Sequence, residues 1–254
     1  MNKKMIFNHY ANILDDLIEE YDFFKYYFQN PFSLDEDVYY GDFSEALFSK
    51  NHLNICCGAT RNCLIDEWFD WVVKFNNPED YESGSCEDEV NIYAIAKANG
   101  MEKYFAEPIY LGEYTKEIYF YNYNTLEYNM ERYCMFDEVS FYKEYQKAAE
   151  KYGMEKKEIT IRIPLYAFPR AERYDFYKDQ KEDPHLKEVV SKSNSPLNER
   201  STVIGYAFAA KYGEEEFIKF SSFLEAEKIN DIHTGNIMMR NGDFILTDYA
   251  GYND

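Results

Sequence analysis

The sequence predicts an α+β fold, with short strands gathered in its first half and helices dominating its second half. Three observations lead to this prediction: β-rich runs between residues 53 and 123, helical periodicity over residues 201–229, and an Asn-Gly turn between two apolar runs near the C-terminus. The composition supports a packed core, because 46% of the 254 residues are hydrophobic and 19% are aromatic.

The first half is predicted from apolar spacing and from breaker residues. An amphipathic helix is expected from Lys4 to Gln29, where Asn30-Pro31 ends it. The other elements expected here are a short helix at 42–50, strands at 53–57, 62–65 and 71–75, a helix at 86–99 stopped by Gly100, and an antiparallel pair of strands at 109–114 and 117–123.

The second half is predicted to be mostly helical. A helix at 139–152 and a strand at 159–166 precede a polar stretch at 178–200, which is expected to be a loop or an insertion. Ser201 is expected to cap a helix that runs through Lys211, and a last helix is expected at 214–229. Three domains follow: an N-terminal helical extension at 1–40, a small lobe at 41–126, and a second lobe at 127–254 with an insertion at about 153–200.

The composition excludes several classes of protein. No apolar run is long enough to span a membrane, and the start of the chain lacks a signal-peptide core, so a cytoplasmic protein is expected. The five cysteines are odd in number and lack metal-ligand spacing, which favours reduced thiols over a zinc site or a cysteine nucleophile.

The charge balance is strongly acidic, with 47 acidic and 27 basic residues and a formal net charge of −20. Such a field repels nucleic acid and anionic membrane surfaces and attracts basic partners. A basic protein partner or substrate is therefore expected, with simple solubility as the alternative explanation.

The end of the chain carries the pattern that is most informative about chemistry. Asp231 is followed five residues later by Asn236, and an apolar pair, a polar turn and an apolar strand then lead to Asp248. A phosphoryl-transfer site uses such residues, an aspartate to orient the attacking hydroxyl and oxygen ligands to hold Mg²⁺ under the phosphates of ATP. We therefore assign Asp231 as the candidate catalytic residue, and Asn236 and Asp248 as the candidate metal ligands. The alternative interpretation of the same segment is a plain hairpin with an Asn-Gly turn.

The small lobe offers candidates for the rest of such a site. Lys74, in an apolar-apolar-Lys strand, is the candidate phosphate ligand, with an edge-strand lysine kept for solubility as the alternative. Glu89 on the following helix is the candidate partner of Lys74, and Glu87 is the competing candidate. The alternative is that both glutamates only interact favourably with the helix dipole.

A glycine-bearing turn between the first two strands is the candidate phosphate loop. Gly58, Thr60 and Arg61 would bind phosphate oxygens of ATP through backbone N–H groups and side chains. A hairpin turn without ligand is the alternative, because the segment has a single glycine.

The segments Asp231–Met238, Asn241–Asp243 and Ile245–Asp248 together resemble the kinase domain of the host-shutoff protein kinases of T7-like bacteriophages, within the protein-kinase-like superfamily. Gly58 to Lys74 is more loosely similar to the same family. The resemblance implies a kinase-like two-lobed α+β fold, with a small antiparallel-sheet N-lobe and a shortened, mostly helical C-lobe. It also implies ATP and Mg²⁺ as cofactors, and the host cytoplasm as location if the gene is carried by a phage.

Several residues depart from the pattern of the superfamily. Asn230 replaces the arginine that precedes the aspartate in loop-regulated kinases, His233 stands where protein kinases usually have lysine, and only six residues follow Asp248. We therefore expect no activation segment.

The expected function is ATP- and Mg²⁺-dependent phosphoryl transfer to a hydroxyl, with Ser or Thr of a basic host protein as the first acceptor. Two alternatives stay open. One is a catalytically inactive kinase fold that binds and inhibits a basic host protein, and the other is a small-molecule phosphotransferase of the aminoglycoside or choline type.

Overall fold

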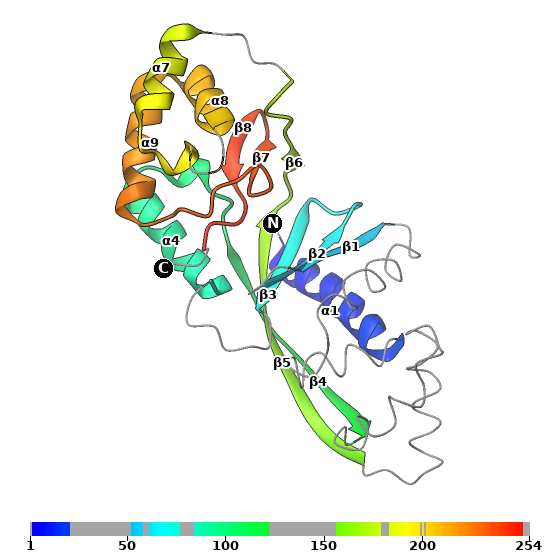
Figure 1. Ribbon diagram of the computed structural model, residues 1–254. Helices are drawn as coiled ribbons and strands as arrows, with labels where there is room; N and C mark the ends of the chain where they lie inside the picture. The colour runs from blue at the N-terminus through cyan, green and yellow to red at the C-terminus, as the bar shows by residue number, and fades with distance from the viewer. Residues whose placement is uncertain are drawn as a thin grey trace, which may run out of the picture. The chain divides into compact units, whose positions relative to one another are not determined.

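The structure is a computed structural model, and it describes residues 2–20, 52–57, 61–76, 84–121, 156–178, 183–198, 200 and 202–250. Its fold is α+β, as the sequence predicted (Figure 1). The chain divides into two compact units. The first unit holds Met1–Asp80 and Tyr110–Ala167, and the second unit holds Tyr81–Ile109 and Phe168–Asp254.

The first unit contains helix α1 (Lys3–Glu20) and a five-stranded sheet with the order β1-β2-β3-β5-β4. The strands are β1 (Leu53–Cys57), β2 (Arg61–Asp66), β3 (Trp71–Asn76), β4 (Ile109–Tyr121) and β5 (Lys156–Pro169). β1 and β2 pair antiparallel, as do β2 and β3. The three strands predicted between residues 53 and 75 are thus confirmed.

Helix α1 packs its apolar stripe against this unit, so the predicted amphipathic helix is confirmed over Lys3–Glu20. The buried side chains recur at helical spacing and are Ile6, Tyr10, Ile13, Leu14, Leu17 and Ile18. The predicted continuation to Gln29 and the predicted helices at 42–50 and 139–152 lie outside the described residues.

Polar contacts fix α1 against the sheet. His9 Nε2 lies 2.8 Å from Asp66 Oδ2 at the end of β2. Further along the helix, Asp15 Oδ1 accepts hydrogen bonds from the Tyr114 hydroxyl at 2.8 Å and from Lys116 Nζ at 2.7 Å, both on β4. Burial raises the pKa of Asp15, but the bonds from Lys116 and Tyr114 outweigh it and hold this pKa below its ordinary value.

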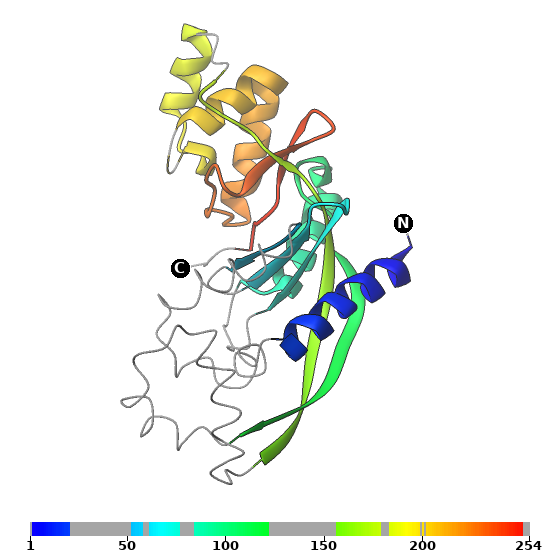
Figure 2. The same cartoon turned by 90° about the vertical axis from the view of Figure 1, so that its right-hand side faces the viewer.

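Strand β4 corrects one prediction. The two strands predicted at 109–114 and 117–123 form one strand, Ile109–Tyr121, which neighbours β5 in the sheet and lies beside it in both views (Figures 1 and 2). The residues between the predicted strands include no glycine, proline or asparagine to form a turn. A partner strand far along the chain therefore keeps this segment extended.

The limits of the two units also differ from the predicted domain limits 1–40, 41–126 and 127–254. Helix α1 belongs to the first unit together with its sheet, while residues 81–109 belong to the second unit. β5 pairs into the first sheet although it follows residue 127. Local sequence patterns do not report such long-range pairing.

The second unit is mostly helical and carries a three-stranded sheet with the order β6-β7-β8. Its helices are α4 (Cys86–Ala98), α7 (Pro184–Lys192), α8 (Thr202–Tyr212) and α9 (Glu214–Ala226), with single 3₁₀ turns at Glu102–Tyr104 and Pro196–Asn198. Its strands are β6 (Glu172–Arg173), β7 (Ile237–Arg240) and β8 (Asp243–Leu246). The helices predicted at 86–99, 201–211 and 214–229 are confirmed within a few residues at their ends.

Helix α7 corrects the prediction that residues 178–200 form a loop. The Asp183 side chain accepts hydrogen bonds from the backbone N–H groups of His185 and Leu186, and Pro184 occupies the first helical position. Val190 is buried on this helix. The polar composition of the segment concealed a short helix that has its own cap.

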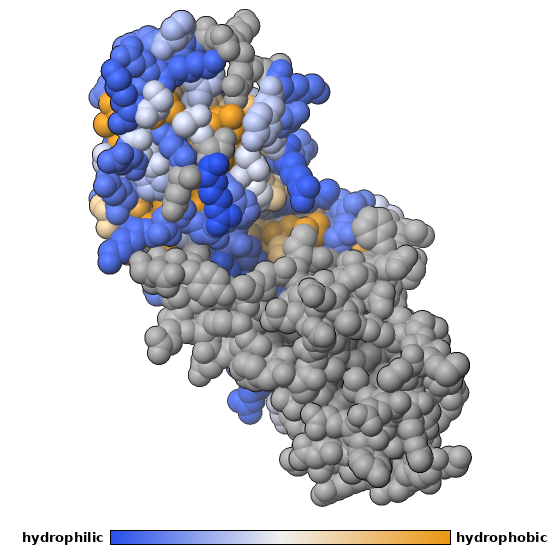
Figure 3. All heavy atoms as spheres, viewed as in Figure 1, coloured by the Kyte–Doolittle hydropathy of each residue, from blue (hydrophilic) through white to orange (hydrophobic). Residues whose placement is uncertain are grey.

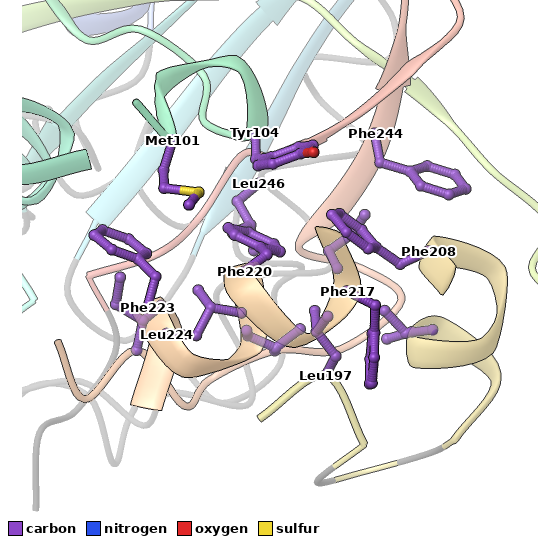
Figure 4. Close-up of a cluster of buried hydrophobic side chains, with 14 of the residues drawn as sticks. Met101, Tyr104, Leu197, Phe208, Phe217, Phe220, Phe223, Leu224, Phe244 and Leu246 are labelled. Carbon is purple, nitrogen blue, oxygen red and sulfur yellow. The ribbon is translucent and has the colours of Figure 1, made fainter. Parts of the chain in front are cut away.

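An aromatic core fills the second unit (Figure 4). Phe208 and Phe220 stack with ring centroids 4.9 Å apart, and Tyr104 lies 4.5 Å from Phe220. The Tyr104 hydroxyl donates to Glu216 Oε1 at 2.7 Å. Burial and this bond raise the pKa of Tyr104, so the hydroxyl keeps its proton and remains a donor.

The segment after α4 is joined to the C-terminal hairpin. Ala106 N donates to Leu246 O at 2.8 Å, and Phe105 forms a parallel bridge with Leu246. The Tyr249 hydroxyl donates to Ala106 O at 2.8 Å. These bonds fix the end of β8, the strand that leads into Asp248.

Gly205 in α8 provides a test of this packing. A Cβ atom at position 205 would lie 2.2 Å from Asn198 Oδ1 and 3.2 Å from the Phe217 ring. Although alanine favours helix by about 1 kcal/mol over glycine, this overlap should cost more, so Gly205→Ala is expected to lower the free energy of unfolding by about 1–3 kcal/mol in urea titrations. The matched variant Ala210→Gly, at an exposed position of α8, should lose about 1 kcal/mol. A Gly205→Ala protein more stable than wild type would contradict the packing.

The surface of the described residues is mainly polar on the face seen in Figure 3, with small hydrophobic areas between the hydrophilic side chains. In the described part of the chain, no helix combines the length and the apolar character needed to cross a bilayer.

Candidate functional site

The hairpin of β7 and β8 is the scaffold of the candidate site. Its turn has positive φ at both central residues, 52° at Asn241 and 86° at Gly242, which is the geometry that Asn-Gly favours. The pairing runs from Arg240 opposite Asp243 to Ile237 opposite Leu246. The predicted hairpin is confirmed, and its open end leads back to Asn236 and on to Thr247.

Two bonds close this open end. Asn236 O accepts from Thr247 N at 2.8 Å and from the Thr247 hydroxyl at 3.2 Å. Asp248 follows Thr247 directly. The structure therefore brings the two candidate metal ligands, Asn236 and Asp248, to neighbouring positions at one end of the hairpin, as the sequence predicted.

The loop that carries Asp231 begins where α9 ends. Lys228 adopts the left-handed conformation with φ 56°, and Ile229 N donates to Leu224 O at 2.8 Å, which closes the helix with a Schellman motif. Ile229 and Ile232 are buried at 3% and 1% exposure. These two anchors hold Asp231 between them, and its side chain is 34% exposed.

Asn236 ties the loop together. Its Nδ2 donates to Asp231 O at 2.9 Å, so the amide bridges the two ends of the five-residue step from Asp231 to Asn236. The Asn236 residue is only 8% exposed. His233 supports the same loop, since its carbonyl accepts from Asn236 N at 2.9 Å and its Nδ1 accepts from Gly235 N at 3.0 Å.

Arg200 is a site residue that the sequence analysis missed. Its guanidinium Nη2 lies 2.7 Å from Asp231 Oδ1. The pair is partly exposed, so it positions the carboxylate more than it stabilises the fold. No local sequence pattern relates Arg200 to Asp231, because they lie 31 residues apart, with α8 and α9 between them.

A polar pocket lies beside the loop. It has a volume of about 380 Å³ and is lined by Ser193, Asn194, Ser195, Pro196, Asn198 and Asn230. Five of these six residues come from the segment between α7 and α8, and Asn230 immediately precedes Asp231. We call this cavity the polar pocket.

The other predicted residues are distributed over both units. Lys74 lies on β3 of the first unit opposite Cys63 and is 6% exposed, and Arg61 begins β2 in the same unit and is 8% exposed. Gly58 and Thr60 lie outside the described residues. Lys74 is buried on β3, which has a neighbouring strand on both sides, and this does not fit an edge-strand lysine kept for solubility.

Glu89 lies on α4 of the second unit and is fully buried, whereas Glu87 is exposed. Ser85 and Asp88 form a reciprocal capping box at the start of this helix, with Asp88 N donating to Ser85 Oγ at 3.1 Å and Ser85 N to Asp88 Oδ2 at 2.8 Å. Asp88 thus caps the N-terminus of α4. A carboxylate buried like that of Glu89 is costly unless it is paired.

The donor set at the hairpin end suits a magnesium ion. Because Asn236 Nδ2 is used by Asp231 O, the amide oxygen is the atom left for a cation, and Asp248 adds a carboxylate. Both are hard oxygen ligands, and Mg²⁺ needs few protein ligands when phosphate oxygens and water complete its shell. Within the described ranges, no group of three or more His, Cys, Asp or Glu side chains is placed to hold a metal by itself.

Comparison with protein-family models finds no match for this chain, and comparison with curated proteins finds no similar sequence. The candidate site is therefore interpreted from its own geometry.

Proposed function

We propose that this protein transfers a phosphoryl group from ATP to a hydroxyl group in the presence of Mg²⁺. The observation that carries the proposal is the closure of the hairpin end by the Thr247–Asn236 bonds together with the Asn236–Asp231 bond. These bonds join the loop that carries Asp231 to the hairpin that carries the two candidate oxygen ligands, which supports a role in phosphoryl transfer.

Each residue has a separate role in this reaction. Asp231 orients the acceptor hydroxyl and takes its proton as the oxygen attacks the γ-phosphorus and the bond to ADP breaks. Asp231 Oδ1 is held by Arg200, which leaves Oδ2 for the acceptor. Asn236 and Asp248 would hold Mg²⁺, which neutralises charge on the phosphates. As in the sequence analysis, Lys74, Arg61, Gly58 and Thr60 would be the ligands of the phosphates.

Two classes of acceptor fit this reaction. The net charge of −20 favours a hydroxyl side chain of a basic protein, because the field of the enzyme would attract it. The polar pocket beside Asp231 favours a small molecule. We also propose, as part of the same function, that the α+β fold is kinase-like.

The test is incubation of the purified chain with radiolabelled ATP and Mg²⁺, with cell lysate in one arm and a mixture of small hydroxyl compounds in the other. Label is expected to reach an acceptor in at least one arm and to be lost when a chelator removes Mg²⁺. A chain that binds no Mg·ATP would overturn the proposal. Nucleotide binding without any transfer would instead support an inactive fold that acts by binding a basic protein.

A further inference from the structure

We propose that the polar pocket binds a small, neutral, polyhydroxylated acceptor and presents one of its hydroxyls to Asp231. This inference rests on the proposed function and names its substrate class. Its first support is position: Asn230 lines the pocket, and the next residue is the candidate catalytic aspartate. Ile232 N donates to Asn230 O at 2.7 Å, so a tight turn holds Asn230 and Asp231 at the rim of the cavity.

The wall of the pocket is held in place by hydrogen bonds. Ser195 Oγ donates to Ser221 Oγ at 2.6 Å, and both residues are buried. Asn198 Nδ2 donates to Val190 O at 2.6 Å and to Ser193 Oγ at 2.8 Å. Because α7 and α9 provide these partners, the wall has a defined shape before any ligand arrives, which lowers the entropy cost of binding.

Tight packing beneath the wall supports the same conclusion. Leu197 is 1% exposed, and Asn198 Oδ1 lies so close to α8 that only glycine fits at position 205. The segment between α7 and α8 thus packs into the core on one side and lines the polar pocket on the other. Its conformation is fixed by this packing.

The chemistry of the lining selects the ligand. Among the six lining residues, three carry an amide, two carry a hydroxyl and none carries a charge. A charged ligand would lose hydration there without a counter-charge, and an apolar ligand would leave the amides of Asn194 and Asn230 without partners. A neutral polyol can both donate hydrogen bonds to and accept them from these two amides. The volume of about 380 Å³ falls within the range of small-ligand sites, about 300–1,000 Å³.

The charged pair at the rim fits the same assignment. Arg200 and Asp231 neutralise each other at 2.7 Å, so they add no net charge that would recruit an ionic acceptor. The transfer forms a bond between the acceptor oxygen and the γ-phosphorus and breaks the bond to ADP. The acceptor proton passes to Asp231.

The experiment measures binding and transfer separately. Glucose, ribose and myo-inositol are the neutral probes, with glucosamine and gluconate as the cationic and anionic comparators. At least one neutral probe is expected to bind the wild-type chain without ATP, more tightly than either comparator, and to accept labelled phosphate. Asn194 is exposed at the pocket, so Asn194→Phe should obstruct the cavity without disturbing the core and weaken this binding by at least about tenfold. Mg·ATP binding should be unchanged.

Asn91→Phe is the matched control, since Asn91 is an exposed asparagine on α4 of the same unit. It should bind the probe as wild type does. If no neutral probe binds, or if Asn194→Phe binds it as well as Asn91→Phe does, the inference is wrong. If the probe binds in the pocket but no phosphate moves, the substrate assignment fails together with the proposed function, whereas transfer to lysate proteins alone overturns only the substrate assignment.

Discussion

Replacement of Asp231 by asparagine is expected to slow phosphoryl transfer by about 10²- to 10⁴-fold while Mg·ATP still binds. Asparagine keeps an oxygen that can accept from Arg200, so the loop should retain its shape, but it cannot take the proton of the acceptor hydroxyl. Transfer of label from ATP measures the first effect, and nucleotide titration measures the second. Stability should change little, because the Arg200–Asp231 pair is partly exposed.

Asp243→Asn is the matched control for this variant. Asp243 begins β8 and accepts from the Tyr212 hydroxyl at 3.0 Å, a bond that an asparagine oxygen preserves. The control makes the same chemical change on the hairpin, so its activity should stay near that of wild type. Equal activity of wild type and Asp231→Asn would remove Asp231 from the reaction and favour the inactive, binding interpretation.

Replacement of Asp248 by alanine is expected to abolish the contribution of Mg²⁺ to nucleotide binding. Loss of residues that only support a metal ligand costs about 10- to 100-fold in affinity, so loss of a ligand should cost at least about 100-fold. Calorimetry with ATP, in Mg²⁺ and in chelator, measures the difference. Wild type and Asp248→Ala should bind nucleotide equally when Mg²⁺ is removed.

Glu215→Ala is the control for charge alone, because it removes one exposed carboxylate of α9 and leaves the hairpin untouched. If Glu215→Ala weakens Mg·ATP binding as much as Asp248→Ala does, the effect reflects the acidic field of the protein and Asp248 is not a ligand.

Local signals in the sequence predicted the C-terminal hairpin, the three strands between residues 53 and 75 and the last helices well. The Asn241-Gly242 turn fixes its own geometry, so the juxtaposition of Asn236 and Asp248 could be predicted from a single short segment. Strand β4 was predicted as two strands although no turn-forming residue separates its halves, and its partner β5, which keeps it extended, lies far along the chain.

The surroundings of Asp231 were missed for a similar reason. Helix α7 is polar, and its Asp183-Pro184 cap was the local signal that could have found it. Arg200 and the polar pocket come from the segment after α7, which reaches the loop only once α8 and α9 have packed. Sequence patterns thus predicted the candidate reacting groups, but tertiary packing supplies the groups around them.

The bonds between residues 105–106 and the C-terminal hairpin have a practical consequence for genetic tests. The Tyr249 hydroxyl and Ala106 O are separated by 143 positions, yet their bond and the Leu246 bridge cover one edge of the aromatic core. A shortened gene product that lacks the hairpin would expose Tyr104 and Phe105 as well as lose Asp248. Its failure would not reveal whether chemistry or folding was lost, and only single substitutions such as those above can separate the two.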